Sequence, residues 1–168
     1  MERSDLRAPG GGVVSLALKS GREPPRPTLG RKGIALLERV PLFEGLSRHQ
    51  LRRVAGSAEE VRYGEGRPVV HEGARGDAFY VVVEGSAKVV RGPTRRRIGR
   101  LGPGDFFGEL ALLTGGTRTA SVVAETPLVT IRLSRAAFQD VVKHEPGVAL
   151  KVMVALAARV RRWSSMDA

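Results

Sequence analysis

One segment between Gly102 and Ala120 combines residue types that could bind an anion. Gly108 has no side chain and allows the backbone to approach a ligand closely. The residues that follow, 109–113, could form a single helical turn whose free N–H groups face a negative charge. The chain then returns through a glycine pair to Arg118, whose guanidinium can hold the same anion in a charge-assisted pair. The spacing therefore predicts an anion-binding loop.

Glu109 lies inside this loop and limits the kinds of ligand that we expect the loop to bind. Its carboxylate would repel a phosphate, so a more favourable partner is a hydroxyl donor on the same ligand. An anion and a hydroxyl on one small molecule indicate a sugar phosphate. The alternative is a surface ion pair between Glu109 and Arg118 beside a glycine turn. These two charges alone would favour that alternative.

The composition limits the classes of protein that the chain can be. Lys and Arg exceed Asp and Glu by 28 to 17, a net charge of +11 that favours anionic partners such as nucleic acid, acidic lipid or a phosphorylated small molecule. The absence of cysteine excludes a disulfide scaffold, thiol catalysis and a cysteine-ligated metal. No apolar run reaches the roughly 20 residues of a membrane span, and no secretory signal is evident. We expect a soluble, cytoplasmic protein.

The elements that must position the loop are predicted to be mainly short strands. Seven β-rich runs are separated by glycine and proline turns, at 61–63, 68–71, 78–83, 87–90, 96–101, 119–124 and 128–133. Two short helices, 34–42 and 47–54, precede them, and two more, 135–143 and 146–163, follow. This order predicts a mainly β fold with flanking helices: an eight-stranded antiparallel jelly-roll barrel, with short N-terminal helices and two C-terminal helices.

The chain is predicted to divide into a leader and one folded domain. Residues 1–33 are basic and rich in proline and glycine, a composition typical of a flexible tail that builds no core. Residues 34–168 contain all the periodic segments and form the predicted domain. The arginines between positions 91 and 100 lie on a predicted hairpin, either as a solvated hairpin or as a patch for nucleic acid or membrane.

The loop closely resembles the phosphate-binding cassette of cyclic-nucleotide-binding domains, the modules of the catabolite activator protein and of cyclic-nucleotide-dependent kinases. Residues 107–112, Phe-Gly-Glu-Leu-Ala-Leu, and residues 118–120, Arg-Thr-Ala, match every position of the family's pattern. Residues 76–85 resemble the family's central strand motif, and Leu42-Phe43 resembles its leading helical segment. The likeness spans about residues 38–163.

This resemblance implies a role for each cassette residue. Arg118 should bind the cyclic phosphate, and Glu109 should bind the ribose 2′-hydroxyl. Thr119 occupies a position that often adds a hydroxyl contact to the phosphate or the base. The implied ligand-binding set, with backbone N–H groups included, is Gly108, Glu109, Leu110, Ala111, Arg118, Thr119 and Ala120.

The resemblance also bears on the base of the nucleotide. A threonine after the arginine is compatible with cyclic GMP, but it also occurs in sites that accept both nucleotides, so it decides little. Cyclic AMP is the first choice because the chain looks like the bacterial, single-domain members of the family, and cyclic GMP is the second. The last helix should cover the base, and the residues at the family's base-contact positions are Arg159, Val160, Trp163 and Ser164. Trp163 could stack on the purine as a lid or pack against the barrel or a second copy.

These features predict a ligand-sensing regulatory module rather than an enzyme. Binding a cyclic phosphate needs no catalytic group and no cofactor beyond the ligand itself. The three histidines, His49, His71 and His144, lack metal-ligand spacing, so no metal site is expected. Ligand binding should close the cassette and reposition the C-terminal helices.

A second hypothesis is a transcription regulator of the catabolite-activator type. DNA binding would require a helix-turn-helix after the last predicted helix, and the chain ends at Ala168. We therefore do not expect nucleic-acid binding unless the sequence is a fragment of a longer regulator. Without a DNA-binding segment, the sensor would have to signal through an unknown downstream protein or through a homodimer. The apolar stripe Val152, Leu156 and Val160 on the last helix could pair two copies or pack on its own barrel.

Overall fold

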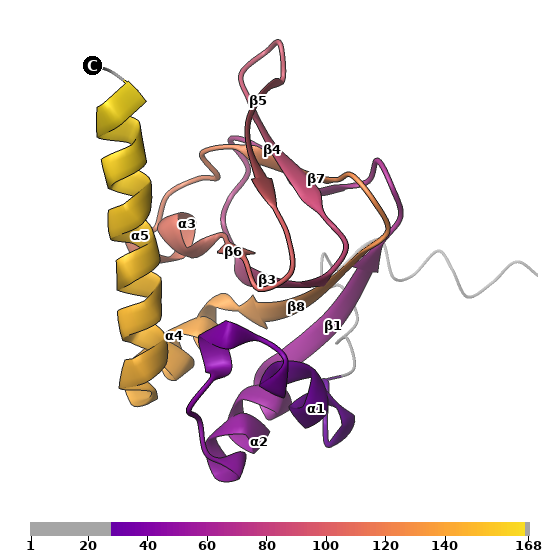
Figure 1. The fold of residues 1–168 in the computed structure, drawn as a ribbon, viewed down its shortest axis with the longest axis vertical. Helices are drawn as coiled ribbons and strands as arrows, with labels where there is room; N and C mark the ends of the chain where they lie inside the picture. The colour runs from indigo at the N-terminus through magenta and orange to yellow at the C-terminus, as the bar shows by residue number, and fades with distance from the viewer. Residues whose placement is uncertain (1–27, 167–168) are drawn as a thin grey trace, which may run out of the picture.

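The computed structural model describes residues 28–166, with side chains described up to residue 162. Eight antiparallel strands form the centre of this part of the chain (Figure 1). They are β1 (Ala58–Tyr63), β2 (Pro68–Val70), β3 (Ala78–Glu84), β4 (Ala87–Arg91), β5 (Arg96–Leu101), β6 (Phe106–Phe107), β7 (Ser121–Ala124) and β8 (Leu128–Ser134). The mainly β fold with eight antiparallel strands and flanking helices is confirmed.

The strands form two four-stranded sheets, in the orders β1-β8-β3-β6 and β2-β7-β4-β5. The bounds of several elements differ from the sequence prediction, and two of the differences bear on the cassette. The two-residue strand β6 was not predicted, because two residues are too few to show a period. Strand β7 begins at Ser121 and not at Thr119, because Thr119 and Ala120 lie in a bend before it. That bend leaves both residues available at the edge of the sheet.

Helices lie before, within and after the strands (Figure 1). The N-terminal group is α1 (Lys32–Glu38), the short 3-10 helix η1 (Pro41–Phe43) and α2 (Arg48–Ser57). Helix α3 (Glu109–Thr114) is the predicted helical turn, and α4 (Arg135–His144) and α5 (Pro146–Met166) close the chain. Two of these helices begin with a serine cap: the side chain of Ser47 accepts from Gln50 N, and that of Ser134 accepts from Ala137 N.

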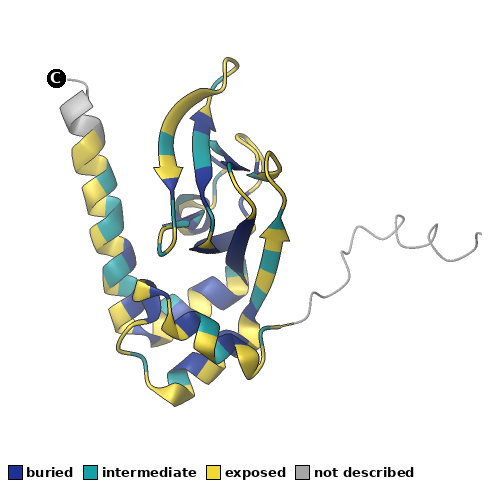
Figure 2. Cartoon of the chain, turned by 45° about the vertical axis from the view of Figure 1, so that its right-hand side comes forward, coloured by how far each residue is buried: buried dark blue, intermediate teal, exposed yellow. Residues whose placement is uncertain are grey.

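The core has two parts because β3 is buried on both faces. Phe79 and Val81 face the helical layer, where the ring of Phe79 stacks on that of Phe138 with 4.7 Å between centroids. Tyr80 and Val82 alternate with them and face the second sheet. Figure 2 shows the buried residues on the inner strands and on the helices that pack against them. This packing fixes β3, which pairs with β6, the strand that leads into the cassette.

The packed structure begins upstream of residue 34, where the sequence placed the domain boundary. Leu29 packs against the core, and its N–H donates to the carbonyl of Ala58 at 2.8 Å. Thr28 forms a bridge with Glu59. The rest of the predicted leader, residues 1–27, lies outside the described residues. Within the described part of the chain, no helix is long and apolar enough to cross a membrane.

Candidate functional site

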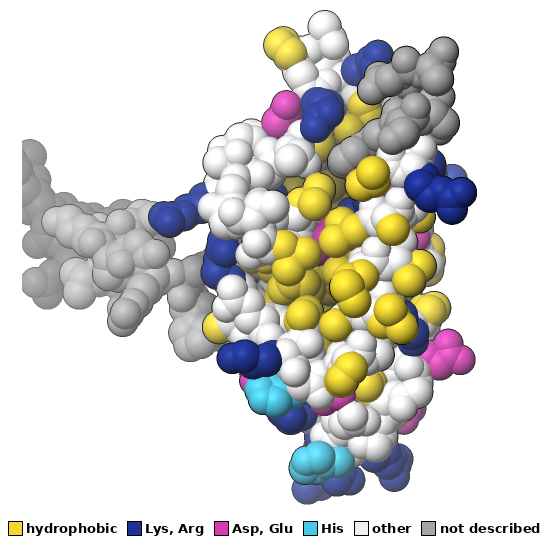
Figure 3. Space-filling model, turned by 90° about the vertical axis from the view of Figure 1, so that its left-hand side faces the viewer, with side chains coloured by type: hydrophobic (Ala, Val, Ile, Leu, Met, Phe, Trp, Pro, Cys, Tyr) yellow, Lys and Arg dark blue, Asp and Glu magenta, His cyan; other side chains and the backbone are white. Residues whose placement is uncertain are grey.

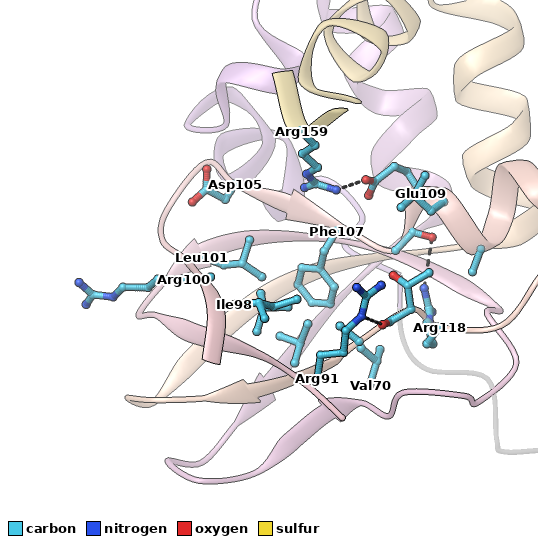
Figure 4. A pocket seen from close by; sticks show the side chains of 18 of the residues that line it. Val70, Arg91, Ile98, Arg100, Leu101, Asp105, Phe107, Glu109, Arg118 and Arg159 are labelled. Carbon is cyan, nitrogen blue, oxygen red and sulfur yellow. Dashed lines mark hydrogen bonds and ion pairs between the residues drawn. The ribbon is translucent and has the colours of Figure 1, made fainter. Parts of the chain in front are cut away.

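A cavity of about 350 Å³ lies between the β4–β5 hairpin, helix α3 and helix α5 (Figure 4). All seven residues predicted from the cassette line it, from Gly108 to Ala111 and from Arg118 to Ala120. Arg159 lines it from α5, as the sequence analysis anticipated for the last helix. The two halves of the cassette, separated by the α3 turn, therefore meet at one cavity.

Gly108 is required by the geometry of the cassette. It stands before α3 with φ of 95°, in the left-handed region that disfavours side chains. A Cβ atom at this position would lie 2.6 Å from Arg118 Nη1 and 2.7 Å from the carbonyl oxygen of Ala78. The missing side chain thus makes room for the arginine that enters from the other half of the cassette.

Arg118 is held by the backbone of the fold. Its side chain is 5% exposed, and Nη2 donates to the carbonyl of Ala78 at 2.7 Å while Nη1 donates to that of Gly108 at 3.2 Å. Asp77 Oδ1 lies 3.7 Å from Nη2. Burial lowers the pKa of Arg118, but an arginine begins so far above neutrality that the group stays cationic. A fixed cation therefore stands at the cavity wall.

Glu109 is fully buried, and only one of its two carboxyl oxygens has a hydrogen-bond partner among the described residues. Its Oε1 is paired with Arg159, whereas Oε2 is buried and has no hydrogen-bond partner among the described residues. Burial raises the pKa of Glu109, and the positive charge of Arg159 opposes that rise. An unpartnered carboxyl oxygen costs free energy unless a ligand or water supplies a hydrogen bond. Glu109 is therefore suited to bind a ligand hydroxyl.

Arg159 connects α5 to the cassette. Besides Glu109, it donates through Nη2 to the carbonyl of Phe106 at 2.6 Å, and its guanidinium carbon lies 5.8 Å from the Phe106 ring centroid. Arg162, which the sequence analysis did not single out, also lines the cavity from α5. It follows Arg159 by three residues, so the helical period could have identified it.

The other predicted base-contact residues either do not line the cavity or have side chains outside the described residues. Val160 is 56% exposed and is not among the residues that line the cavity. The side chains of Trp163 and Ser164 are outside the described residues, so the lid hypothesis for Trp163 stays a prediction. Residues 163–166 belong to α5 by their backbone.

The wall opposite the cassette was not predicted from the sequence. Val89 of β4 and Ile98 and Leu101 of β5 give it an apolar surface. Arg91, the last residue of β4, also lines the cavity, and its Nε donates to the carbonyl of Thr119 at 3.0 Å. Side chains alternate along a strand, so Val89 and Arg91 lie on the same face of β4. This alternation is the feature of the sequence from which the wall could have been predicted.

Comparisons with known proteins agree with this geometry. The family model of the cyclic nucleotide-binding domain matches residues 60–145. This chain therefore belongs to the cyclic nucleotide-binding domain family, as its cassette indicated. Among the described residues there is no group of three or more His, Asp or Glu side chains that could hold a metal ion.

This chain matches only part of the length of each relative. The cAMP-dependent protein kinase regulatory subunit of Aspergillus fumigatus is 39% identical over 105 residues, 62% of this chain and 25% of the relative. The regulatory domain of Toxoplasma gondii PKA, solved with cAMP, has a TM-score of 0.65 at 28% identity. The match covers 75% of this chain and 49% of the Toxoplasma chain. The catabolite activator protein of Thermus thermophilus has a TM-score of 0.67 at 31% identity, covering 75% and 61%.

The matches define the class of domain and no more. The chain is a cyclic nucleotide-binding domain similar to the regulatory subunits of cAMP-dependent protein kinases. It spans between 25% and 61% of the length of the three relatives described above. Their activities as whole proteins therefore do not transfer to this chain.

Proposed function

We propose that this domain is a regulatory sensor that binds a 3′,5′-cyclic nucleotide in the cavity beside α3. Arg118 binds the cyclic phosphate, and Glu109 binds the ribose 2′-hydroxyl through Oε2. Backbone N–H groups of Gly108, Leu110 and Ala111 and the hydroxyl of Thr119 complete the sugar-phosphate site. The observation that carries the proposal is the buried, unpartnered Oε2 of Glu109, which lines the same cavity as the fixed cation of Arg118.

The two groups fit the two parts of such a ligand. A cyclic phosphate carries one negative charge, which a guanidinium can pair with in a bidentate hydrogen bond. A hydroxyl donates one hydrogen bond, which is what Oε2 lacks. Solved cAMP-bound relatives support cyclic AMP as a ligand, and cyclic GMP carries the same sugar phosphate. No catalytic step is proposed, because binding alone accounts for each group.

The same contacts suggest how binding is transmitted. Glu109 is shared between the proposed ligand hydroxyl and Arg159 of α5. A hydroxyl that binds Oε2 changes the charge distribution and hydrogen bonding around the carboxylate that holds Arg159. We infer that the cassette closes on the ligand and that α5 shifts in response, which biases a two-state element as regulatory switches do.

The response of α5 would be passed on by its outer face. Val152 is buried and Leu156 is partly buried against the core, so most of the stripe predicted to pair two copies packs on the domain itself. Other apolar side chains of α5 are exposed by 59–62%: Leu150, Met153 and Val154. Figure 3 shows apolar side chains gathered on this face of the molecule. We propose this outer face as the contact for a second copy or a downstream protein.

Calorimetric titration with cyclic AMP and cyclic GMP tests the proposed function. We expect saturable heat with at least one nucleotide and competition between the two for one site. Glu109→Gln should weaken both nucleotides together, because the ribose hydroxyl is common to them. The ribose-modified control, 2′-deoxy cyclic AMP, should bind weakly to the natural protein and should lose little further affinity on Glu109→Gln. Absence of heat and of thermal stabilisation with either nucleotide would contradict the proposal.

A further inference from the structure

Arg91 is an arginine in the cavity whose role the cassette does not explain. Its Nε–H donates to the carbonyl of Thr119 at 3.0 Å, whereas its two terminal amino groups have no partner among the described residues. Figure 4 shows the Arg91 side chain extending from the β4 wall into the cavity. The end of β4 is fixed as well, because Gly92 N donates to Glu72 Oε2 at 2.8 Å. Arg91 therefore presents free donors from an anchored position.

Two other arginines that line the cavity, Arg100 of β5 and Arg159 of α5, have carboxylate partners. Arg100 lies 3.4 Å from Glu125 Oε2, and Arg159 is paired with Glu109. A ligand phosphate on Arg118 would satisfy that residue too. The amino groups of Arg91 would still lack acceptors after the sugar phosphate is bound, so they are available for another part of the ligand.

The remaining part of the ligand is the base, and the cavity has one wall suited to it. With the sugar phosphate at Arg118 and Glu109, the planar purine lies against the apolar surface of β4 and β5. Ile98 belongs to that surface and is 43% exposed, an uncovered apolar side chain that a base would cover. Gly99 has no side chain and leaves room beside it. Arg91 follows Val89 on the same face of β4 and so stands at the edge of this wall.

The chemistry of a guanidinium selects between the purines. All N–H groups of arginine donate, and none accepts. Guanine presents two acceptors side by side, O6 and N7, whereas adenine presents the acceptor N7 beside the donor N6 amino group. We propose that Arg91 is a specificity residue that donates to O6 and N7 of guanine, so that the site favours cyclic GMP over cyclic AMP. This inference rests on the proposed function of the same cavity.

The expected preference is modest. Bidentate arginine–guanine contacts discriminate against the wrong base by roughly fivefold to 150-fold in affinity. Arg91 is exposed, so water competes for its donors, and we expect the lower end of that range. The natural protein should therefore bind cyclic GMP at least about fivefold more tightly than cyclic AMP.

Three nucleotides and one substitution separate this contact from others. Cyclic IMP keeps O6 and N7 of guanine but lacks the 2-amino group, so it reports on Arg91 and not on a contact from Thr119 to that amino group. We expect the full chain to bind cyclic GMP and cyclic IMP with similar affinity and both more tightly than cyclic AMP. Arg91→Gln should abolish this preference, because glutamine matches the acceptor–donor edge of adenine.

Arg95→Gln is the matched control, because Arg95 lies in the turn of the same hairpin and does not line the cavity. It removes the same charge and should leave all three affinities in their original ratio, and thermal melting should show that both variants fold. Three outcomes would overturn the base contact while leaving the proposed function intact: an equal loss of all three nucleotides in Arg91→Gln, cyclic IMP behaving like cyclic AMP, or no preference in the natural protein. Failure of all three nucleotides to bind would overturn both proposals.

Discussion

Two arginines take part in the site, Arg118 within the cassette and Arg159 from α5, and they are held in different ways. Arg118 is 5% exposed and donates to the carbonyls of Ala78 and Gly108, which belong to the fold itself. Arg159 extends from α5 and is held by Glu109, whose other oxygen is offered to the proposed ligand. The first arginine is positioned before a ligand arrives, and the second depends on a side chain that the ligand would share. We therefore propose that Arg118 sets the affinity for the ligand and that Arg159 carries the response.

The largest effect should come from removing the fixed arginine. Arg118→Ala leaves the cyclic phosphate without its cation, and we expect binding to weaken by about 2–5 kcal/mol, or roughly 1.5 to 3.5 decades in Kd. Calorimetric titration with cyclic AMP and cyclic GMP measures this loss. The matched control is Arg62→Ala, because Arg62 is an exposed arginine that is paired with Glu60 and is not among the residues that line the cavity. A change below about threefold in Arg118→Ala would mean that the phosphate binds elsewhere.

Substitutions at two glycines that flank α3 test whether the cassette holds Arg118 in a fixed position. Gly108 and Gly115 both have positive φ, 95° and 71°, so alanine is strained at either position. A Cβ on Gly108 would contact Arg118 and Ala78, whereas one on Gly115 meets nothing within 4 Å. Gly115→Ala should cost about 1 kcal/mol of unfolding free energy. Gly108→Ala should cost roughly 1–3 kcal/mol more, because of overpacking.

Denaturant unfolding of the two variants measures this difference. Equal losses would show that both Arg118 and the carbonyl of Ala78 move aside at no cost, and that the cassette does not fix the arginine. Gly108→Ala should also weaken nucleotide binding, while Gly115→Ala should leave it nearly unchanged.

The shared carboxylate predicts a dependence of stability on pH. Burial raises the pKa of Glu109 above its usual value of 4.5, so the folded state holds a proton that the unfolded state has released. The contribution of Glu109 to stability is therefore full below pH 4.5 and is lost as pH rises through the folded pKa. In this window the free energy of unfolding should fall by at most about 1.4 kcal/mol per pH unit relative to Glu109→Gln.

Chemical unfolding of both proteins at several pH values above 4.5 measures this difference. The Gln variant lacks the titrating group and serves as the baseline. A difference that grows with pH would show that the attraction of Arg159 exceeds the cost of burial and lowers the pKa of Glu109.

The cassette could be predicted from the sequence because its parts are local. Gly108, Glu109 and Arg118 fall within eleven residues, and the α3 turn that joins them needs only neighbouring hydrogen bonds. The caps Ser47 and Ser134 are local in the same sense, since each binds a backbone N–H three residues ahead. The alternating strands were recognised for the same reason. Short-range chemistry leaves its pattern in the sequence.

Contacts between distant segments left no such pattern. Glu109 and Arg159 are 50 positions apart, and their pairing depends on how α5 packs across the cassette. Sequence reasoning placed Arg159 near the base and not on the carboxylate. Arg91 was one of several arginines on the hairpin, and only the β4 face that lines the cavity distinguishes it. The burial of Val152 was equally undecided, because an apolar stripe looks the same against a barrel or a partner.

The smallest effect on affinity, and the clearest on response, should follow from Arg159→Met. Methionine keeps an apolar stem but cannot donate to Glu109 or to the carbonyl of Phe106. Because Arg159 donates to Glu109 and to the carbonyl of Phe106 and not to the proposed ligand, we expect Kd to change by no more than roughly fivefold, or about 1 kcal/mol. Amide hydrogen exchange along α5 should respond to nucleotide in the natural protein and cease to respond in this variant.

Lys151→Met provides the contrast on the same helix. Lys151 donates to the carbonyls of Pro41 at 2.8 Å and Glu44 at 3.0 Å, so it ties α5 to η1 and not to the cassette. Its loss should increase exchange in α5 equally with and without nucleotide, and leave the ligand-dependent change in place. If Arg159→Met kept that change, the signal would pass from cassette to α5 by another route, and the distinction between the two arginines would fail.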